Sequence, residues 1–403
     1  MKILYIVQHF STPLGSAGIR PYCCALGLAA AGHNVTIVCG SYAGGVTGLS
    51  SGFSCGTREG EIEKGIHVCE FDLRYSNRDS FWNRVATFFA YAIKATKVAL
   101  VRDYDVIVCS STPLTVVIPG IFARMFRRKR FVLEIRDLWP ELPKAMGIIK
   151  NPILLMALSV LEAVGYITAH RLIGLAPGIV EGIASRGISR DRIRFIPNGC
   201  DLSLFGRPGK PWRPVGVNSD DFMVVYAGTH GFANGLDAVL DAARILLSRN
   251  RADIKFVFVG DGICKSRLQR RQVEEDLATV IFLDSVEKAV LAELLASADL
   301  GLQVLSNVPA FYQGTSPNKF FDYLSASVPV LCNYPGWIAE LIREYECGTV
   351  VPAGDSIKFA DALEELSSCS VKLEIMSSKG VQLARDRFDR SALTEDWVRW
   401  VTN

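Results

Sequence analysis

Short runs of valine, isoleucine and leucine alternate along this chain with longer stretches in which apolar residues recur every three to four positions. The short runs are typical of buried parallel strands, and the longer stretches are typical of helices that cover a sheet. This alternation predicts an α/β fold built from parallel βαβ units rather than an antiparallel sandwich. The first half has seven predicted strands, at 2–7, 35–39, 66–70, 106–109, 131–135, 172–175 and 193–196. Six more are predicted at 223–227, 255–259, 280–283, 299–304, 328–332 and 349–351, with helices between them such as 236–249 and 288–297.

The two series of strands are separated by residues 206–214, which are dense in proline and glycine and therefore predict a linker. A chain of 403 residues is also longer than one hydrophobic core usually serves. We predict two Rossmann-like domains, 1–200 and 201–384, that face each other across a cleft. The last segment, 385–403, is predicted to form a helix that packs back on the first domain. Ligands are expected outside the carboxyl ends of the parallel strands.

Composition narrows the class of protein. Although 49% of the residues are hydrophobic, no apolar run reaches the roughly 18 residues that a membrane-spanning helix needs. Residues 1–7 are too short for a secretory leader and predict a first strand instead, so we expect a cytoplasmic protein. The eleven cysteines form no paired Cys-x-x-Cys motif and there are only five histidines, so we expect no metal site. No cofactor beyond a substrate nucleotide is expected.

Charge is distributed unevenly between the two halves. Residues 1–200 carry 23 lysines and arginines against 14 acidic residues, a net charge of +9, and the remaining residues carry −6. Basic residues gather at 124–130, and aromatic residues alternate with basic ones over 81–97. This mixture suits a surface that rests on anionic lipid and receives a lipid-borne substrate. Two ordinary helices with basic residues at their solvent edge explain it as well. Nucleic acid is not expected as a partner, because no recognised binding motif accompanies the charge.

A phosphate site is predicted where residues 316–326 open a helix after a predicted strand. Pro317 fits the first helical turn because its missing N–H would be unpaired there, so the amides of Asn318 and Lys319 can face an anion. The ammonium group of Lys319 adds a full charge, and Ser316 precedes the turn. Asp322, nearly one turn later, can accept hydrogen bonds from sugar or ribose hydroxyls. Phosphate and hydroxyls together indicate a nucleotide, although an ordinary helix with a buried apolar face explains the segment about equally well.

Three glycine-rich turns at the ends of predicted strands add further candidates for substrate contacts. None of them is the Gly-x-Gly-x-x-Gly fingerprint of a dinucleotide site, and each alone is explained by a tight turn. Together with residues 316–322 they favour a ligand site between two domains. The candidate residues in these turns and at the end of the first strand are His9, Gly15, Ser16, Gly18, Arg20, Thr229, His230, Gly262 and Lys265.

Several segments resemble one known family. The sequences IPNGCD at 196–201, FVGDG at 258–262 and VPV at 328–330 are similar to motifs of the retaining family-4 glycosyltransferases of bacteria, and the resemblance covers nearly the whole chain. The segments EIRDLWPE at 134–141 and GTHG at 228–231 resemble those of N-acetyl-L-fucosamine transferases of O-antigen and capsule biosynthesis. The resemblance implies the GT-B fold and an enzyme of class EC 2.4 that transfers a sugar with retention and without a metal. It also implies a UDP-sugar donor that carries an N-acetylated 6-deoxy sugar, and an undecaprenyl-diphosphate-linked acceptor at the inner face of the cytoplasmic membrane.

The resemblance also implies roles for single residues. The departing diphosphate is stabilised by positive charge, and Lys319 with its helix amides is the candidate for this role. Arg136, Asp137 and Glu141 would face the cleft and orient the acceptor hydroxyl. For Asp137 and Glu141, a structural ion pair is about as good an explanation.

The chain departs from the family pattern at several positions. The first glutamate of the family's Glu-x7-Glu pair falls on Gly314, and the second is replaced by Asp322. The basic residues that often bind diphosphate in this family would lie near Thr229 and Asn234, neither of which is basic. The family's His-Asp pair reads Arg136-Asp137. These departures keep two alternatives open: a sugar-nucleotide epimerase of the same fold, and a non-catalytic subunit that binds a sugar nucleotide.

Overall fold

The computed structural model describes residues 1–76, 79–206 and 209–403, apart from the side chain of Phe81. The chain forms two compact units. Unit 1 comprises Met1–Asn198, Gln313–Ser316 and Ser391–Asn403, and unit 2 comprises Gly199–Tyr312 and Pro317–Arg390. Residues 207 and 208 of the predicted linker lie outside the described residues. The rest of that segment belongs to unit 2, whose first residue, Gly199, precedes it.

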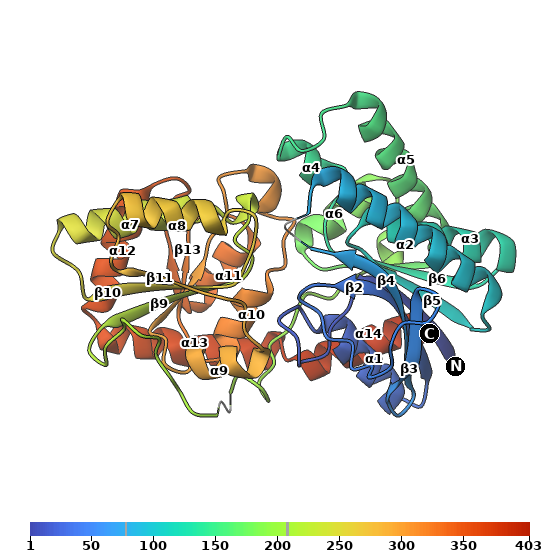
Figure 1. Cartoon of the computed structure of the whole chain (residues 1–403), viewed down its shortest axis with the longest axis horizontal. Helices are drawn as coiled ribbons and strands as arrows, with labels where there is room; N and C mark the ends of the chain where they lie inside the picture. The colour runs from blue at the N-terminus through green and yellow to red at the C-terminus, as the bar shows by residue number, and fades with distance from the viewer. Residues whose placement is uncertain (77–78, 207–208) are drawn as a thin grey trace. The chain divides into compact units, whose positions relative to one another are not determined.

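Unit 1 is built on an eight-stranded sheet in the order β3-β4-β2-β1-β5-β6-β7-β8 (Figure 1). All seven strands predicted for this half are present, each within a few residues of its predicted bounds. The strands are β1 (Lys2–His9), β2 (Asn34–Tyr42), β3 (Thr57–Glu63), β4 (Ile66–Tyr75), β5 (Val106–Ser110), β6 (Arg130–Ile135), β7 (Arg171–Gly174) and β8 (Ile193–Phe195).

The strand β3 is an addition to the predicted set and runs antiparallel to β4 at the edge of the sheet. Its sequence, TREGEIE, is mostly polar, and none of its residues is buried. An edge strand with one partner and charged side chains lacks the apolar run by which buried strands are identified. The expectation of an entirely parallel sheet was therefore wrong at this edge.

Helices cover both faces of this sheet (Figure 1). One face carries α1 (Arg20–Ala30) and α14 (Arg390–Thr402), and the other carries α2 (Phe81–Val101), α3 (Val117–Arg127), α5 (Pro152–Thr168) and α6 (Pro177–Ser185). Shorter elements are α4 (Glu141–Ala145), η1 (Leu114–Val116) and η2 (Arg190–Arg192). The terminal helix was predicted from residue 385, but the preceding helix extends to Arg387 and α14 begins only at Arg390. The indole of Trp397 lies in the core of unit 1, 5.6 Å from the ring of Tyr5, so α14 does return to this unit.

Unit 2 has a six-stranded parallel sheet in the order β11-β10-β9-β12-β13-β14, and every predicted strand is present. The strands are β9 (Phe222–Ala227), β10 (Ile254–Val259), β11 (Val280–Leu283), β12 (Leu300–Gln303), β13 (Val330–Cys332) and β14 (Gly348–Val350). The helices are α7 (Asp237–Ser248), α8 (Lys265–Glu274), α9 (Lys288–Leu295), α10 (Asn318–Ser325), α11 (Trp337–Tyr345), α12 (Ser356–Ser367) and α13 (Ser370–Arg387), with the short turns η3 (Phe232–Asn234) and η4 (Pro309–Phe311). Apolar side chains of β9, β10 and β12 pack against those of α7 and α12 in the core.

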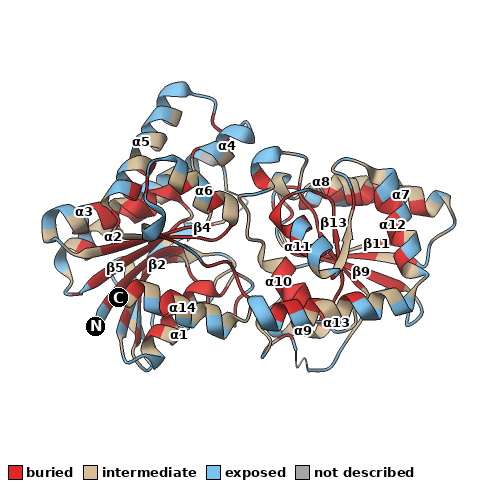
Figure 2. Cartoon of the chain, turned by 180° about the vertical axis from the view of Figure 1, so that it is seen from behind, coloured by how far each residue is buried: buried red, intermediate tan, exposed pale blue. Residues whose placement is uncertain are grey.

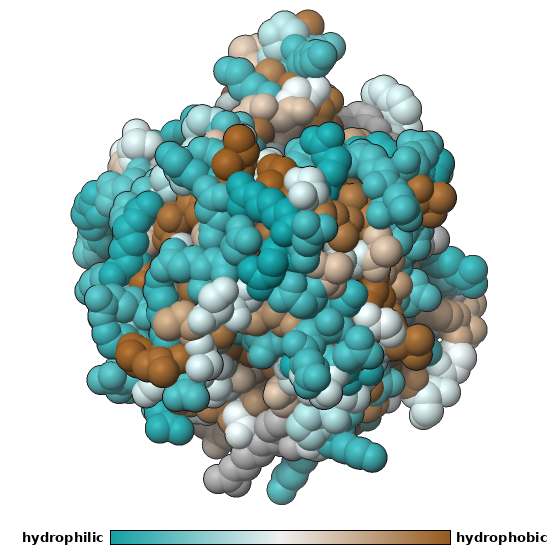
Figure 3. All heavy atoms as spheres, turned by 90° about the vertical axis from the view of Figure 1, so that its left-hand side faces the viewer, coloured by the Kyte–Doolittle hydropathy of each residue, from teal (hydrophilic) through white to brown (hydrophobic). Residues whose placement is uncertain are grey.

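The surface is uneven in polarity. The face shown in Figure 3 is mainly hydrophilic, and its apolar residues are scattered. None of the helices in the described parts of the chain is long and apolar enough to cross a bilayer.

Candidate functional site

The start of α10 presents free backbone amides next to the sheet of unit 2. Pro317 is the N-cap residue, with φ −75° and ψ 121°, so the helix begins at Asn318, one residue later than predicted. The first amide to donate within this turn is that of Phe320, whose N–H reaches the carbonyl oxygen of Pro317 at 3.2 Å. The N–H groups of Asn318 and Lys319 precede that bond and are available to an anion.

Lys319 adds a positive charge to these amides. Its Nζ lies 5.0 Å from the centroid of the Tyr226 ring, at the end of β9. Among the described residues no carboxylate pairs with it, because the nearby Asp322 is paired with Lys288. Burial lowers the pKa of Lys319 to about 8, and the charge of Asp322 opposes this effect. A half-buried ammonium group without an acidic partner favours an anionic ligand at this position.

The turn after β9 is shaped to admit the Lys319 side chain. Gly228 has φ +151°, and a Cβ built on it would lie 3.1 Å from Cε of Lys319. A Cβ on Gly260, in the turn after β10, would lie 2.0 Å from the carbonyl oxygen of Gly228. Glycine is therefore required at both turns, at Gly228 for its backbone angle and at Gly260 for the close approach of the two backbones.

Asp322 lies on α10 in the same region but is not a free carboxylate. Its Oδ2 accepts a 2.7 Å hydrogen bond from Nζ of Lys288 at the start of α9. Both side chains are buried, with exposed fractions of 5% for Asp322 and 11% for Lys288. This ion pair was not predicted from the sequence. The contact of Asp322 with sugar or ribose hydroxyls stays a prediction, and it would have to use the carboxylate while Lys288 holds it.

Lys265 does not serve as a phosphate ligand in this structure. Its buried ammonium group donates to the carbonyl oxygens of Gly260 and Leu283, at 3.0 and 2.9 Å, and pairs with Asp284 at 2.7 Å. An ammonium group has three donors, and all three are used. In this structure the side chain holds the ends of β10 and β11 together, and a contact of Lys265 with a ligand stays a prediction.

His230 and Gly262 hold the same two turns in contact. A Cβ on Gly262 would lie 2.5 Å from the carbonyl oxygen of His230, and the N–H of His230 donates to the carbonyl oxygen of Asp261 at 2.9 Å. The imidazole of His230 is fully buried, and neither ring nitrogen has a partner within the described residues. Burial, with the charge of Lys265, lowers its pKa to about 4, so the ring is neutral at pH 7. Thr229 is exposed beside them, and its carbonyl oxygen accepts from Tyr226 Oη at 2.9 Å.

In unit 1, the side chain of Arg20 is held by partners of its own chain. Its guanidinium donates to Oε2 of Glu134 through Nε and Nη2, at 3.0 and 2.9 Å. The remaining donors reach the carbonyl oxygens of Pro197 and Ile196, at 2.6 and 3.0 Å. Burial would raise the pKa of Glu134, but the Arg20 charge and hydrogen bonds outweigh it and lower that pKa. The guanidinium of Arg20 is thus engaged by buried partners, and its predicted contact with a substrate stays a prediction.

The glycine turn before α1 also uses its polar groups internally. The N–H of Gly15 donates to the carbonyl oxygen of Thr12 at 3.1 Å, and that of Ser16 donates to Gly44 at 3.1 Å. A Cβ on Gly15 would lie 2.3 Å from Oγ of Ser11, so close packing explains why this residue is a glycine. The amides of Gly15 and Ser16 are therefore not free for the phosphate they were predicted to bind. Gly18 lies half-buried two residues before α1.

A second polar group of residues lies at the carboxyl ends of the adjacent strands β1, β5 and β6. Asp137 accepts a 2.8 Å hydrogen bond from Thr112 Oγ1, and the backbone N–H of Arg136 donates to Ser111 Oγ at 3.0 Å. Burial raises the pKa of Asp137, while Thr112 and Arg136 oppose the shift. The charge of Arg136 also acts on His9, whose pKa burial lowers to about 3. The structure thus brings the predicted residues His9, Arg136 and Asp137 together.

The ring of His9 is packed among aromatic side chains. Its centroid lies 4.4 Å from that of Tyr75, 5.1 Å from that of Tyr42 and 6.5 Å from that of Phe88. The neutral imidazole therefore acts as an aromatic surface and a hydrogen-bonding group rather than as a cation. Sequence reasoning missed Thr112 and Ser111 here, although a Ser-Ser-Thr run directly after a buried strand was a visible signal.

Two further predicted residues have structural partners within unit 1. Glu141, on α4, pairs with Arg186, which is the ion-pair alternative left open by the sequence. Ser316 accepts the backbone N–H of Asn198 at its Oγ, at 3.0 Å, and its carbonyl oxygen accepts from Asn198 Nδ2 at 2.6 Å. Asn198 of the IPNGCD segment therefore fixes the residue that precedes Pro317. Ser316 holds the chain in place and is occupied by that contact.

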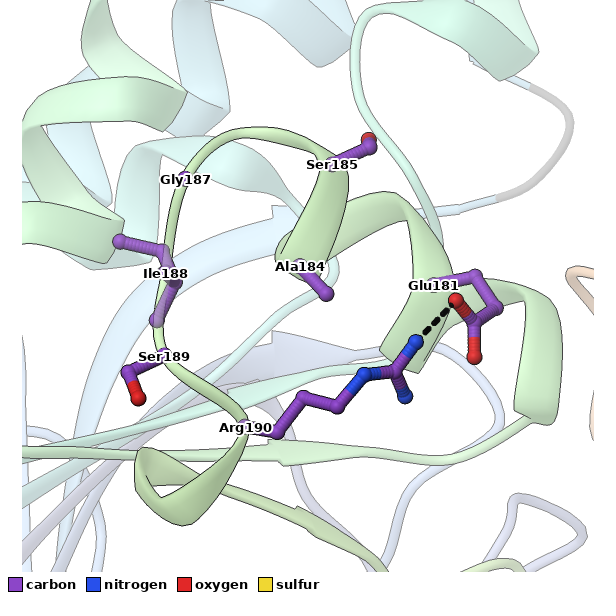
Figure 4. Close-up of a pocket in the computed structure, with 7 residues that line it drawn as sticks. All are labelled: Glu181, Ala184, Ser185, Gly187, Ile188, Ser189 and Arg190. Atoms are coloured by element: carbon purple, nitrogen blue, oxygen red, sulfur yellow. Dashed lines mark hydrogen bonds and ion pairs between the residues drawn. The ribbon is translucent and has the colours of Figure 1, made fainter.

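Shallow depressions elsewhere on the surface contain none of these residues. One lies at the end of α6 and is lined by seven residues between Glu181 and Arg190, which themselves form an ion pair at 2.5 Å (Figure 4). Another lies on α13 of unit 2. In the described parts of the chain, no group of three or more histidines, cysteines or acidic residues could hold a metal ion. The start of α10 and the ends of β1, β5 and β6 are the candidate sites, because their polar groups are suited to bind phosphate and sugar hydroxyls.

Comparisons with known proteins cover both units. Residues 18–199 match the family described as "Glycosyl transferase 4-like domain", and residues 221–368 match the family described as "Glycosyl transferases group 1". A search of curated proteins gave no match.

Solved structures share the fold over nearly the whole chain. Sucrose-phosphate synthase from Thermosynechococcus elongatus is 17% identical with a TM-score of 0.74, over 99% of this chain and 97% of that one. Anabaena Alr3699/HepE in complex with UDP-glucose is 16% identical with a TM-score of 0.67, over 99% and 98% of the two chains. WaaG, a glycosyltransferase involved in lipopolysaccharide biosynthesis, is 15% identical with a TM-score of 0.69, over the full length of both. At these identities the similarity concerns the fold alone.

Proposed function

Since this chain belongs to the group 1 glycosyltransferases of the GT-B fold, EC class 2.4, we propose that it transfers a sugar from a UDP-sugar to a lipid-linked sugar acceptor. Unit 2 is the proposed donor domain and unit 1 the proposed acceptor domain. The observation that carries the proposal is the unpaired ammonium group of Lys319 beside the free amides of Asn318 and Lys319. UDP is the proposed nucleotide because HepE, which shares the fold, binds UDP-glucose.

The proposed chemistry places positive charge where negative charge develops. As the bond from the anomeric carbon to UDP breaks, the β-phosphate gains charge while the sugar becomes oxocarbenium-like. Lys319 and the two amides stabilise that leaving phosphate more strongly than the bound donor. The acceptor hydroxyl then attacks the anomeric carbon and loses its proton, and UDP departs. Retention of configuration follows if the attack comes from the same face, with the leaving phosphate accepting the proton.

In unit 1, we propose that Arg136 and Asp137 orient the acceptor. Asp137 is held by Thr112, so its carboxylate has a fixed position from which it can accept a hydrogen bond from a sugar hydroxyl. His9 is neutral and offers an aromatic surface for an apolar sugar face. An N-acetylated, 6-deoxy sugar such as L-FucNAc is the proposed transferred group, and an undecaprenyl-diphosphate-linked sugar of O-antigen or capsule synthesis is the proposed acceptor.

The decisive experiment measures binding and turnover separately. Calorimetry with UDP, GDP and UDP-N-acetyl sugars, without added metal, tests the donor site in the wild type and in Lys319→Ala. Transfer is then assayed with a radiolabelled UDP-sugar and a short-chain polyprenyl-diphosphate sugar. Selective UDP binding that is weakened in Lys319→Ala, together with sugar transfer, is the expected result. Donor conversion without an acceptor would instead identify the epimerase alternative, and binding without any turnover would identify a sugar-nucleotide-binding subunit.

A further inference from the structure

The turn that follows β9 uses its carbonyl groups internally but leaves two of its amide groups free. The carbonyl oxygen of Thr229 accepts two hydrogen bonds, from Tyr226 Oη at 2.9 Å and from Asn234 Nδ2 at 2.8 Å. The carbonyl oxygen of His230 accepts from the backbone N–H of the N-cap residue of α8 at 2.9 Å. The N–H groups of Thr229 and Gly231 have no partner in the part of the chain that the structure describes. Free amides beside occupied carbonyls favour an anionic ligand.

The peptide unit between Thr229 and His230 is fixed at both ends. Its carbonyl oxygen is held by the two side chains named above, and its N–H donates to the carbonyl oxygen of Asp261 at 2.9 Å. Because three hydrogen bonds hold this one peptide unit, its orientation does not depend on a ligand. The free N–H groups on either side of it are therefore pre-organised before a ligand binds.

The same turn begins beside the ammonium group of Lys319. A Cβ placed on Gly228 would lie 3.1 Å from Cε and 3.6 Å from Nζ of Lys319. The ring of Tyr226 contacts this ammonium group as well, with its centroid 5.0 Å from Nζ. The electrons of an aromatic ring face attract a cation, so Tyr226 holds Lys319 without neutralising its charge. A carboxylate in this place would also hold the lysine, but it would repel a phosphate.

Tyr226 can hold other groups because its own position is fixed. Its side chain is fully buried, and its ring packs edge-on against that of Phe258, its register partner on β10, with 6.1 Å between the centroids. Figure 2 shows β9 and most of α10 in the colour of buried residues, so the elements that carry Tyr226 and Lys319 are both anchored in unit 2. One buried side chain thus links the ammonium group on α10 to the turn after β9.

We infer that Tyr226 and Asn234 are positioning residues of the proposed donor site. Tyr226 holds the ammonium group of Lys319 at the diphosphate. The two side chains together hold the turn after β9, so that its free amides bind the same diphosphate. Backbone amides supply hydrogen-bond donors in fixed directions, while the lysine supplies the charge. The inference rests on the proposed function, because it assigns these groups to the diphosphate of the proposed UDP-sugar.

The first test compares UDP with UMP in calorimetry, because the two ligands differ only in the β-phosphate that Lys319 is proposed to contact. Tyr226→Leu removes the ring, so UDP affinity should fall about tenfold while UMP affinity changes much less. Tyr226→Phe keeps the ring and removes one hydrogen bond to the turn, so it should restore most of this loss. Asn234→Ala removes the other hydrogen bond and should lower UDP affinity about threefold.

A double-mutant cycle shows whether Tyr226 acts through Lys319. Tyr226→Leu should lower UDP affinity in the wild-type background but little further in the Lys319→Ala background. The fall of UDP affinity with rising pH should be flatter in Tyr226→Leu, because the ammonium group is no longer held at the phosphate. It should be unchanged in Tyr226→Phe, which still has the ring.

Two control variants match these changes elsewhere in unit 2. Tyr345→Leu removes the ring of another cation–aromatic pair, in which Cζ of Arg387 lies 5.7 Å from the ring centroid. Asn218→Ala removes an exposed side-chain amide before β9. Both should bind UDP as the wild type does. Far-UV circular dichroism shows which variants fold, and if Tyr226→Leu does not, the double variant Tyr226→Phe/Asn234→Ala still tests the hold on the turn, with an expected loss of about tenfold.

Three outcomes would overturn the inference. They are wild-type UDP affinity in Tyr226→Leu and Asn234→Ala, an equal loss of UDP and UMP affinity in Tyr226→Leu, and a full effect of Tyr226→Leu in the Lys319→Ala background. If the wild type binds UDP through Lys319 while these outcomes are observed, only the positioning roles fail and the proposed donor site stands. A wild type that binds no UDP would overturn the proposed function and this inference together.

Discussion

Nε1 of Trp397 donates a 2.9 Å hydrogen bond to Oε2 of Glu134, the same carboxylate oxygen that the guanidinium of Arg20 holds. Trp397 comes from the end of the chain and Glu134 from β6, so this bond attaches α14 to the centre of unit 1. The other oxygen, Oε1, accepts from Ser110 Oγ at 2.7 Å. One buried carboxylate thus joins the first helix, two central strands and the last helix.

We predict that Trp397→Phe destabilises unit 1 by about 1–2 kcal/mol, because the ring still fills its space while a hydrogen bond to a buried charge is lost. Glu134→Ala should cost more, on the order of 3–5 kcal/mol, since it leaves Arg20 buried without its partner. Urea unfolding followed by circular dichroism measures both. Trp82→Phe is the control, because Trp82 is 73% exposed on α2 and should change stability little. Equal effects of the two tryptophan variants would contradict the proposed role of the Trp397 bond.

Lys319→Ala is expected to lower kcat/KM for the UDP-sugar by on the order of 10²-fold, because one charge-assisted contact to the leaving phosphate is lost. Lys358→Ala is the matched control, since Lys358 is an exposed lysine of the same unit. Steady-state kinetics at saturating acceptor measure the effect. Unchanged kinetics in Lys319→Ala would exclude Lys319 from the donor site.

The lowered pKa of Lys319, about 8, predicts a pH dependence of UDP binding. Only the protonated ammonium attracts the phosphate, so the affinity should be nearly full at about pH 7 and should fall as the pH rises through 8. Lys319→Arg keeps its charge over this range and should bind UDP with a flatter pH profile between 7 and 9.5. Calorimetric titrations across that interval compare the two proteins. A wild-type affinity that stays constant to pH 9.5 would mean that Lys319 does not contact the phosphate.

Gly228→Ala is predicted to weaken UDP binding even though it adds only a methyl group. That methyl would meet Cε of Lys319 at 3.1 Å and would occupy a backbone conformation, φ +151°, that alanine rarely adopts. Gly354→Ala is the control for backbone strain alone, because Gly354 has φ +75° and its added methyl would meet nothing closer than 3.6 Å. Both variants should lose about 1–2 kcal/mol of stability, but only Gly228→Ala should lose UDP affinity. The comparison fails if the two variants bind UDP alike.

The ion pair between Lys288 and Asp322 predicts that single removals are worse than joint removal. Lys288→Met or Asp322→Asn leaves one buried polar group without its charged partner and should destabilise unit 2 by roughly 2–4 kcal/mol. The double variant should recover part of that loss, so a double-mutant cycle should give a clear coupling energy. Thermal or urea unfolding of the four proteins provides the values. Additive single effects would show that the two groups do not depend on each other.

Much of this architecture could be predicted from the pattern of apolar residues. Buried parallel strands such as β5 and β9 are continuous apolar runs, and any structure that exposes such a run to water is unfavourable. The strand β3 escaped prediction because a polar edge strand takes its stability from one neighbour rather than from burial. The exposed side of α5 also could not be predicted, because the helix sequence is apolar on nearly every side and only packing decides which side stays exposed.

The candidate sites likewise have some features that the sequence shows and others that only the fold shows. Sequence alone determined the two series of parallel strands, the glycine turns at their ends and the presence of Lys265 and Lys319 beside those turns. It could not show which lysine is free, since an ammonium group binds a ligand only if no acceptor of its own chain lies within reach. The tertiary structure decided this by surrounding Lys265 with two carbonyl oxygens and Asp284 while leaving Lys319 against the ring of Tyr226. Likewise, Arg20 became structural only when folding brought Glu134, 114 residues away, against it. The local pattern of apolar residues determines secondary structure, because the tendency of each residue to be buried follows from its own side chain. The availability of a charged group to a ligand depends instead on partners that are distant in sequence and meet only in the fold.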